Sequence, residues 1–321
     1  MTELALDELA ARLSGVGVRE VRPLRGGASS LTYAGVRDGD PVVVKVAPPG
    51  VAPTGHRDVL RQARVLRALE HTAVPVPVVL AEDTGAPPAV PPLFVMSFLP
   101  GDSVEPLFDS ADAGPEDVVA QRFRSAATTM ADLHRVTPES VGLADEPTSG
   151  PVDEIARWER TLTTVDPELA PGWREVAGTL RATLPAGAPA AIVHGDFRLG
   201  NLLADGGRIT AVIDWEIWSV GDPRVDVGWF LINSDPCTYD RPTPHRGATP
   251  PPGELAEVYR AARGTDVEDL DWFAALACFK STATWALIVK HNRRRRTPDR
   301  DMEAMAGTLP RLLERARELL D

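Results

Sequence analysis

Two short polar segments near residue 200 contain the residue types that phosphoryl transfer from a nucleotide requires. Asp196 can accept the proton of an incoming hydroxyl, and Arg198 can place positive charge on the transferred group. Asn201 and Asp214 supply amide and carboxylate oxygens, which are suitable ligands for Mg²⁺. Phosphoryl transfer depends mainly on positioning and charge stabilisation, so these four side chains cover much of what the reaction needs.

Apolar runs beside these polar residues predict the elements that position them. Residues 191–193, 202–203 and 209–213 read as short buried strands, and the Asp-Gly-Gly sequence at 205–207 favours a hairpin turn. A single Asp or Asn would indicate an ordinary turn. The joint pattern instead places several polar residues at strand ends that face one point, which predicts a catalytic loop at 194–201.

This set of motifs resembles a known family. The chain reads HGDFRLGN at 194–201, IDW at 213–215 and GDPRVD at 221–226. These segments are similar to the signature H-G-D-x-x-x-x-N, I/L-D-W/F and G-D-P-x-x-D of the aminoglycoside phosphotransferase-like, or kinase-like, phosphotransferases. The wider sequence looks most like the branch that is fused to, or encoded beside, acyl-CoA dehydrogenases. The resemblance covers almost the whole chain.

The resemblance implies an α+β, bilobal protein-kinase-like fold. Its small antiparallel β-sheet lobe with one helix is expected at residues 1–99, and its larger, mostly helical lobe with the acceptor site at 100–321. A length of 321 residues fits two lobes. By the same resemblance, Asp196 and Arg198 are catalytic and Asn201 and Asp214 hold the metal.

Two further residues of these motifs are expected to have structural roles. His194 is more readily explained as a hydrogen-bonding scaffold for the loop than as an acid or base. In related kinases, the position of Asp226 holds the backbone of the catalytic loop.

A glycine-serine loop near residue 27 is a candidate for binding nucleotide phosphates. The candidate residues are Gly26, Gly27, Ser29 and Ser30. Glycine lets backbone N–H groups approach a phosphate closely, although a plain Gly-Gly hairpin turn would have the same sequence. The P-loop signature is absent from the sequence, which disfavours a Walker-type NTPase.

Lys45 lies in the apolar strand sequence VVVKV. An exposed edge-strand lysine is the ordinary explanation, but the residue matches the kinase lysine that holds the α and β phosphates. Its usual partner in the family is a Glu on the next helix, where this chain has Gln62. An amide supplies no charge, and Asp58, one helical turn earlier, is a possible substitute.

The resemblance also implies that the strand after residue 92 runs into a linker whose backbone binds the adenine edge. The candidate residues there are Met96, Ser97 and Phe98. Beside the metal candidate Asp214, Glu216 could reach the metal or only a nearby backbone N–H, and the sequence does not choose between them.

Composition restricts the class of protein. A formal net charge of −12 argues against a nucleic-acid-binding surface. The two cysteines have no metal-ligand spacing. Polar residues interrupt the apolar stretch 273–289, which predicts a core helix and no membrane span. The first residues lack a signal-peptide pattern, so a cytoplasmic protein is expected. The sequence does not predict the oligomeric state.

The sequence therefore predicts an enzyme that uses ATP and Mg²⁺ to phosphorylate the hydroxyl of a small molecule. Hydroxyacyl compounds and aminoglycoside-like molecules both remain possible acceptors. The run Arg293–Arg296 is either a solvated helix end or an anion-binding group in the acceptor site. A catalytically quiet, nucleotide-binding regulatory protein is the alternative that Gln62 favours. A protein kinase is disfavoured because no Ala-Pro-Glu segment follows the metal motif.

Overall fold

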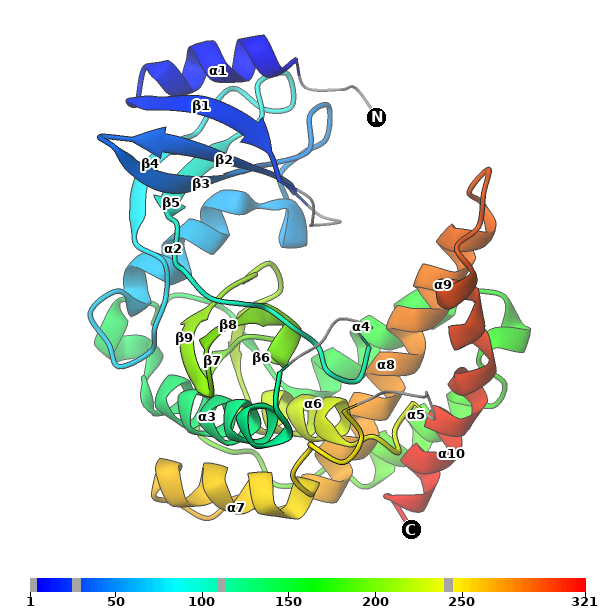
Figure 1. Ribbon diagram of the computed structural model, residues 1–321. Helices are drawn as coiled ribbons and strands as arrows, with labels where there is room; N and C mark the ends of the chain where they lie inside the picture. The colour runs from blue at the N-terminus through cyan, green and yellow to red at the C-terminus, as the bar shows by residue number, and fades with distance from the viewer. Residues whose placement is uncertain (1–4, 25–29, 109–113, 240–244) are drawn as a thin grey trace.

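The computed structural model describes residues 5–24, 30–108, 114–239 and 245–321. Figure 1 shows a sheet lobe formed by the first part of the chain and a larger, mainly helical lobe formed by the rest. The α+β fold predicted from the sequence, with an antiparallel sheet and helices, is confirmed.

The sheet lobe contains one five-stranded antiparallel sheet in the order β1-β2-β3-β5-β4. Its strands are β1 (Val18–Pro23), β2 (Leu31–Arg37), β3 (Asp40–Val46), β4 (Val79–Asp83) and β5 (Leu93–Ser97). Asp38 and Gly39 join β2 to β3 and both have positive φ. This backbone twist suits a two-residue hairpin between right-twisted strands.

Helices cover both faces of this sheet (Figure 1). Helix α1 (Leu6–Ser14) packs Leu9 and Leu13 against one face, and α2 (Val59–Leu69) packs Leu66 and Leu69 against the other. Asp58 caps α2, since its carboxylate accepts hydrogen bonds from the backbone N–H groups of residues 60 and 61. The helix predicted between the strands is thus present, and α1 precedes the first strand.

The larger lobe is built mainly from helices. They are α3 (Glu116–Arg135), α4 (Pro151–Leu162), α5 (Trp173–Ala182), α6 (Arg224–Ser234), α7 (Pro252–Arg263), α8 (Leu270–Arg293), α9 (Arg300–Ala304) and α10 (Leu309–Glu318). Helix α8 is long and apolar enough to cross a membrane, but 72% of its most apolar 18-residue window is buried inside the structure. It packs among the other helices as a core helix, as the sequence predicts.

Short strands carry the polar motifs. A three-stranded sheet contains β6 (Thr148–Ser149), β10 (Ser219–Gly221) and β7 (Ala191–Val193), and a hairpin contains β8 (Leu202–Asp205) and β9 (Arg208–Val212). The strands predicted beside the catalytic loop are therefore present. The isolated bridge Asp102↔Ala204 connects the segment after β5 to this hairpin. The lobe boundary at residue 99 stays a prediction.

Candidate active site

The loop after β7 is held by a buried carboxylate on α6. Asp226 accepts hydrogen bonds from the backbone N–H groups of His194 (2.6 Å) and Gly195 (2.8 Å). Gly195 has φ +84°, and a Cβ atom there would lie 2.6 Å from the carbonyl oxygen of Ile217. The turn therefore requires glycine, and Asp226 makes the contacts that its predicted structural role needs.

A buried chain of hydrogen bonds through His134 and Tyr259 holds the carboxylate of Asp226. His134 Nε2 lies 3.3 Å from the Asp226 carboxylate, and the hydroxyl of Tyr259 lies 2.7 Å from His134 Nδ1. Burial lowers the pKa of His134 despite the neighbouring Asp226, which keeps the imidazole neutral. Burial alone would raise the pKa of Asp226, but hydrogen bonds from His134 and the loop backbone hold it below its ordinary value.

His194 links the catalytic loop to the predicted metal-binding segment. Its Nε2 lies 2.9 Å from the carbonyl oxygen of Ile213, and the backbone N–H of Asp196 donates to its Nδ1 at 3.2 Å. With both nitrogens used in this way, the imidazole fixes the loop relative to the residue that precedes Asp214. These are the contacts of a scaffold.

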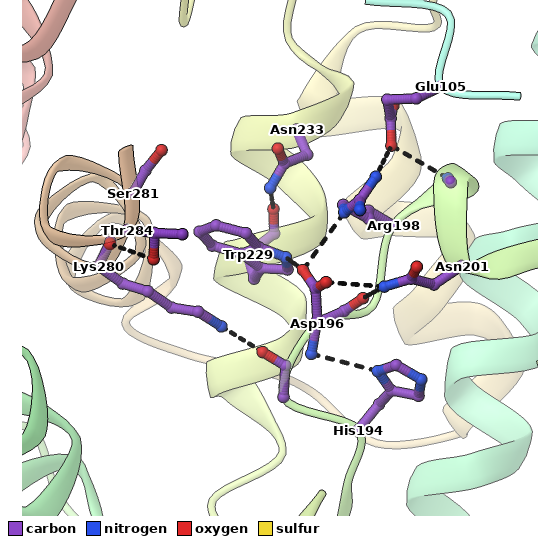
Figure 2. A network of polar contacts seen from close by, with 12 residues as sticks. Glu105, His194, Asp196, Arg198, Asn201, Trp229, Asn233, Lys280, Ser281 and Thr284 are labelled. Carbon is purple, nitrogen blue, oxygen red and sulfur yellow. Dashed lines mark hydrogen bonds and ion pairs between the residues drawn. The ribbon is translucent and has the colours of Figure 1, made fainter. Parts of the chain in front are cut away.

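Asp196 and Asn201 lie side by side at the centre of the site (Figure 2). Asn201 Nδ2 donates to Asp196 Oδ2 at 2.7 Å and to the Asp196 carbonyl oxygen at 2.9 Å. The amide oxygen of Asn201 is thereby turned away from Asp196. This donor set fits the predicted role in binding Mg²⁺.

Asp214, the other predicted metal ligand, has a left-handed backbone with φ +64°. Non-glycine residues rarely adopt this conformation, and it is found often at functional sites. Lys45 Nζ lies 3.1 Å from Asp214 Oδ1. The structure thus brings the predicted phosphate-binding lysine to the predicted metal ligand.

The helix partner expected for Lys45 is not a charged one. Gln62 is buried, and its Nε2 has no hydrogen-bond partner among the described residues. It lines a pocket with Lys45, Met96 and Asp214. The suggestion that Asp58 replaces the missing charge is wrong in this structure. Among the described residues Asp58 forms no ion pair with Lys45, because its Oδ1 caps the N-terminus of α2 and Lys45 pairs with Asp214.

Arg198 is held between two carboxylates (Figure 2). Its guanidinium lies 3.4 Å from Asp196 Oδ1 and 3.2 Å from Glu105 Oε2. Burial opposes the charge, but both carboxylates outweigh it and raise the pKa of Arg198. Glu105, which also accepts from the backbone N–H of Gly200 at 3.1 Å, escaped the sequence analysis because it is distant in sequence and has no motif of its own.

The other predicted nucleotide-binding residues are only partly placed. Gly26, Gly27 and Ser29 lie outside the described residues. Ser30 is 3% exposed, and within the described ranges its hydroxyl has no hydrogen-bond partner.

The predicted linker residues lie at the end of β5. Met96 faces the pocket of Lys45, while the N–H groups of Ser97 and Phe98 donate to the carbonyl oxygens of residues 78 and 41. Those two donors are therefore already used within the sheet, and adenine would have to meet other groups of this segment.

Glu216 lies near the metal-binding candidates. Burial raises its pKa to about 7, and the neighbouring Asp214 adds to this shift while Lys45 opposes it. Whether Glu216 binds the metal or accepts from a nearby backbone N–H remains a prediction in both cases.

Two further residues lie beside Asp196 and were not singled out by the sequence analysis. Trp229 on α6 donates its Nε1–H to Asp196 Oδ1 at 2.8 Å. Lys280 on α8 is 4% exposed and donates to the carbonyl oxygen of Gly195. The only sequence signal for Lys280 is that this lysine, with Ser281 and Thr282, interrupts the apolar stretch 273–289.

Several acidic side chains of the larger lobe pair with arginines of the same chain. The pairs are Glu254 with Arg124 at 2.6 Å, Glu257 with Arg260 at 2.6 Å and Asp269 with Arg224 at 3.0 Å. Arg293 is the last residue of α8, and the other three arginines of the run Arg293–Arg296 follow the helix. All four are exposed, and Arg293 pairs with Glu303 at 2.8 Å. This run has the exposure expected of a solvated helix end.

Residues 20–276 match the model of the phosphotransferase enzyme family, APH. The chain belongs to this family. The match covers the sheet lobe, the catalytic loop and most of the helical lobe, so the resemblance predicted from the sequence is confirmed.

The chain is also similar to parts of several acyl-CoA dehydrogenase proteins. It is 28% identical over 288 residues to acyl-CoA dehydrogenase family member 11 of Gallus gallus, which covers 82% of this chain and 36% of that protein. The chain spans between 20% and 37% of the length of the acyl-CoA dehydrogenase relatives that it matches.

Solved structures share the fold. A candidate aminoglycoside phosphotransferase from Ralstonia eutropha JMP134 superposes with a TM-score of 0.80 at 21% identity, over 99% of this chain and 98% of that one. A thermostable mutant of aminoglycoside phosphotransferase APH(4)-Ia, in a ternary complex with ADP and hygromycin B, has a TM-score of 0.63 at 17% identity, over 96% and 98%.

Proposed function

We propose that this protein is an ATP-dependent O-phosphotransferase that moves the γ-phosphate to a hydroxyl of a small molecule. The observation that carries the proposal is the convergence of Asp196, Asn201, Asp214 and Lys45 from three separate segments onto one site. Family membership supports phosphoryl transfer as the reaction. A structural neighbour that binds ADP supports a nucleotide as the donor.

Each residue has a distinct task in this reaction. Asp196 accepts the proton of the acceptor hydroxyl. The oxygen of that hydroxyl forms a bond to the γ-phosphorus, and the bond from this phosphorus to the departing ADP breaks. Arg198 places positive charge beside the phosphoryl group, and Lys45 holds the remaining phosphates. Asn201 and Asp214 would hold Mg²⁺, which neutralises phosphate charge when it is bound.

The acceptor is better explained as a hydroxyacyl compound than as a polycation. A polycationic aminoglycoside needs a cluster of carboxylates that are free to bind it. Here Glu105 is paired with Arg198, and Glu254 and Glu257 are paired with other arginines. The similarity to acyl-CoA dehydrogenase family member 11 supports the same preference.

The test is a transfer assay with ATP labelled on its γ-phosphate. Candidate acceptors are 3-hydroxybutyrate, its coenzyme A thioester, streptomycin and hygromycin B, each incubated with wild type and Asp196→Ala. Label on a hydroxyacyl compound with wild type alone would support the proposal. Label only on the antibiotics would overturn the acceptor class, and ATP left intact in every reaction would overturn the activity.

A nucleotide-binding regulatory protein is the alternative, and one observation favours it. Gln62 leaves Lys45 without a charged partner on α2, and Lys45 pairs with Asp214 instead. On this reading the protein binds Mg²⁺ and nucleotide without turning the nucleotide over. Nucleotide binding without label transfer or hydrolysis would then be the result.

A further inference from the structure

Asp196 is contacted by a tryptophan that packs against a buried lysine (Figure 2). Trp229 Nε1–H donates to Asp196 Oδ1 at 2.8 Å, and Lys280 Nζ lies 4.0 Å from the centroid of the Trp229 ring. We propose that Trp229 and Lys280 are positioning residues, which hold the Asp196 carboxylate in the orientation that accepts the proton of the acceptor hydroxyl. This inference rests on the proposed function of Asp196 as the base.

The contacts of Asp196 fix how its carboxylate is rotated. Oδ2 accepts from Asn201 at 2.7 Å, and Oδ1 accepts from Trp229 on the opposite side. Two strong donors, one on each oxygen, set the plane of the carboxylate. An ionised carboxylate has about four acceptor positions, so a hydroxyl can still bind. Without Trp229, Oδ1 would keep, among the described residues, the longer 3.4 Å approach of Arg198.

Lys280 has no evident structural reason to be a lysine. Its side chain is buried in α8, and among the residues described no carboxylate oxygen lies within 4.0 Å of its Nζ. A charged group buried without an ion pair is costly, so the fold alone would favour an apolar residue here. Its Nζ contacts the carbonyl oxygen of Gly195, in the catalytic loop, and the face of Trp229, while the Trp158 ring lies farther away at 5.6 Å.

These two contacts couple Lys280 to the base in complementary ways. The bond to Gly195 holds the backbone of the residue that precedes Asp196. The cation over the indole draws electron density from the ring, which strengthens Nε1–H as a donor to the carboxylate. Burial lowers the pKa of Lys280, whereas the nearby carboxylates of Asp196 and Glu154 favour its charged form.

The positions of the two residues separate this role from nucleotide binding. Trp229 and Lys280 belong to α6 and α8, whereas Lys45 and Met96 belong to the sheet lobe. Removing either positioning residue should therefore lower the rate of transfer and leave the KM for ATP close to its wild-type value.

The kinetic test uses water as the acceptor, so that it needs no identified substrate. Mg²⁺-dependent ATP hydrolysis is measured for wild type, Trp229→Phe, Lys280→Met and Lys280→Arg. We expect kcat to fall about tenfold or more in Trp229→Phe and Lys280→Met, with partial rescue in Lys280→Arg, because misorientation of a reacting group is costly. Trp272→Phe and Lys290→Met on α8 are the matched controls and should keep wild-type kcat.

A second readout does not depend on turnover. In protein labelled with ¹⁵N at tryptophan, the indole signal absent from Trp229→Phe identifies Trp229. That signal should move in Asp196→Asn and in Lys280→Met, and stay in place in Lys290→Met.

The outcomes separate the two proposals. Suppose that wild type hydrolyses ATP. A wild-type kcat in Trp229→Phe, or an indole signal that does not move in Lys280→Met, would then overturn the positioning role alone. Wild type without any Mg²⁺-dependent turnover would contradict the proposed function. In that case an indole signal that does not move in Asp196→Asn would overturn the positioning role as well, because Trp229 would then not donate to Asp196.

Discussion

Lys45 Nζ lies 3.1 Å from Asp214 Oδ1, so the lysine expected to hold nucleotide phosphates is paired with the carboxylate expected to hold magnesium. In protein kinases, this lysine forms an ion pair with a glutamate on the helix. Here the helix offers Gln62, which is buried and uncharged. On the proposed function, a bound nucleotide and metal would therefore replace this internal ion pair.

Introducing a charge at Gln62 tests this relationship. Gln62→Glu should compete for Lys45, free Asp214 for the metal, and lower the Kd for ADP with Mg²⁺ by about threefold to tenfold, or roughly 0.7–1.4 kcal/mol. Calorimetric titration of the nucleotide measures the change. Gln121→Glu, an exposed position on α3, is the matched control. Unchanged or weaker binding in Gln62→Glu would mean that the Lys45–Asp214 pair does not limit nucleotide affinity.

Removing the base should affect the rate and leave nucleotide binding in place. Asp196→Ala should lower kcat by roughly 10²–10⁴, the usual contribution of a general base. The melting-temperature shift with ADP should persist, because Lys45 and Asp214 remain. Asp205→Ala, at the exposed end of β8 in the neighbouring hairpin, serves as the control. An unchanged kcat in Asp196→Ala would refute the assignment.

Arg198 offers a test of charge on the transferred group. Arg198→Met should lower kcat by about 10²–10³, comparable to the loss of one donor to a developing charge. Arg198→Lys should retain part of the rate, because it keeps the charge but loses the planar fork that Asp196 and Glu105 hold. Steady-state kinetics measure these changes, with Arg208→Met, at an exposed position on β9, as the control. Equal rates for the methionine and lysine variants would exclude a role for the charge.

The pH dependence of stability should reflect the buried His134–Asp226 pair. The folded pKa values of both groups lie below their ordinary values. Each therefore contributes stability that is complete above its unfolded pKa and is lost as the pH falls through its folded pKa. The His134 contribution begins to be lost below about pH 6.5, and that of Asp226 below about pH 4.

Urea unfolding at pH 7.5 and pH 5.5 measures the His134 contribution. His134→Gln should lose less stability than wild type between these two pH values, because its amide does not titrate. His291→Gln, an exposed position near the end of α8, should keep the wild-type difference. If His134→Gln and wild type lose the same stability between these two pH values, protonation of His134 does not limit stability in this range.

The sequence predicted what depends on local pattern. Strands at 191–193 and 209–213 follow from short apolar runs, and the polar residues beside them follow a spacing that positions reacting groups. The structural role of Asp226 was instead inferred from the resemblance to related kinases, and Gly195 belongs to the same set of motifs.

The sequence could not predict contacts between distant segments. Glu105 meets Arg198 across more than 90 positions, and Lys280 meets Gly195 across 85. Asp58 was misjudged because one carboxylate can cap a helix or pair with a lysine, and the geometry of the helix start decides between them. Such choices are made by tertiary packing and leave no periodic trace in the sequence.

Thermal melting with ADP, with and without Mg²⁺, tests the central claim most directly. A ligand at about 100 times its Kd that binds only the folded state stabilises it by about 2.7 kcal/mol. Wild type should therefore show a Mg²⁺-dependent rise in Tm, and Asp214→Asn should lose it. A rise that persists in Asp214→Asn, or no rise in wild type at millimolar nucleotide, would contradict a nucleotide–metal site at Asp214 and Lys45.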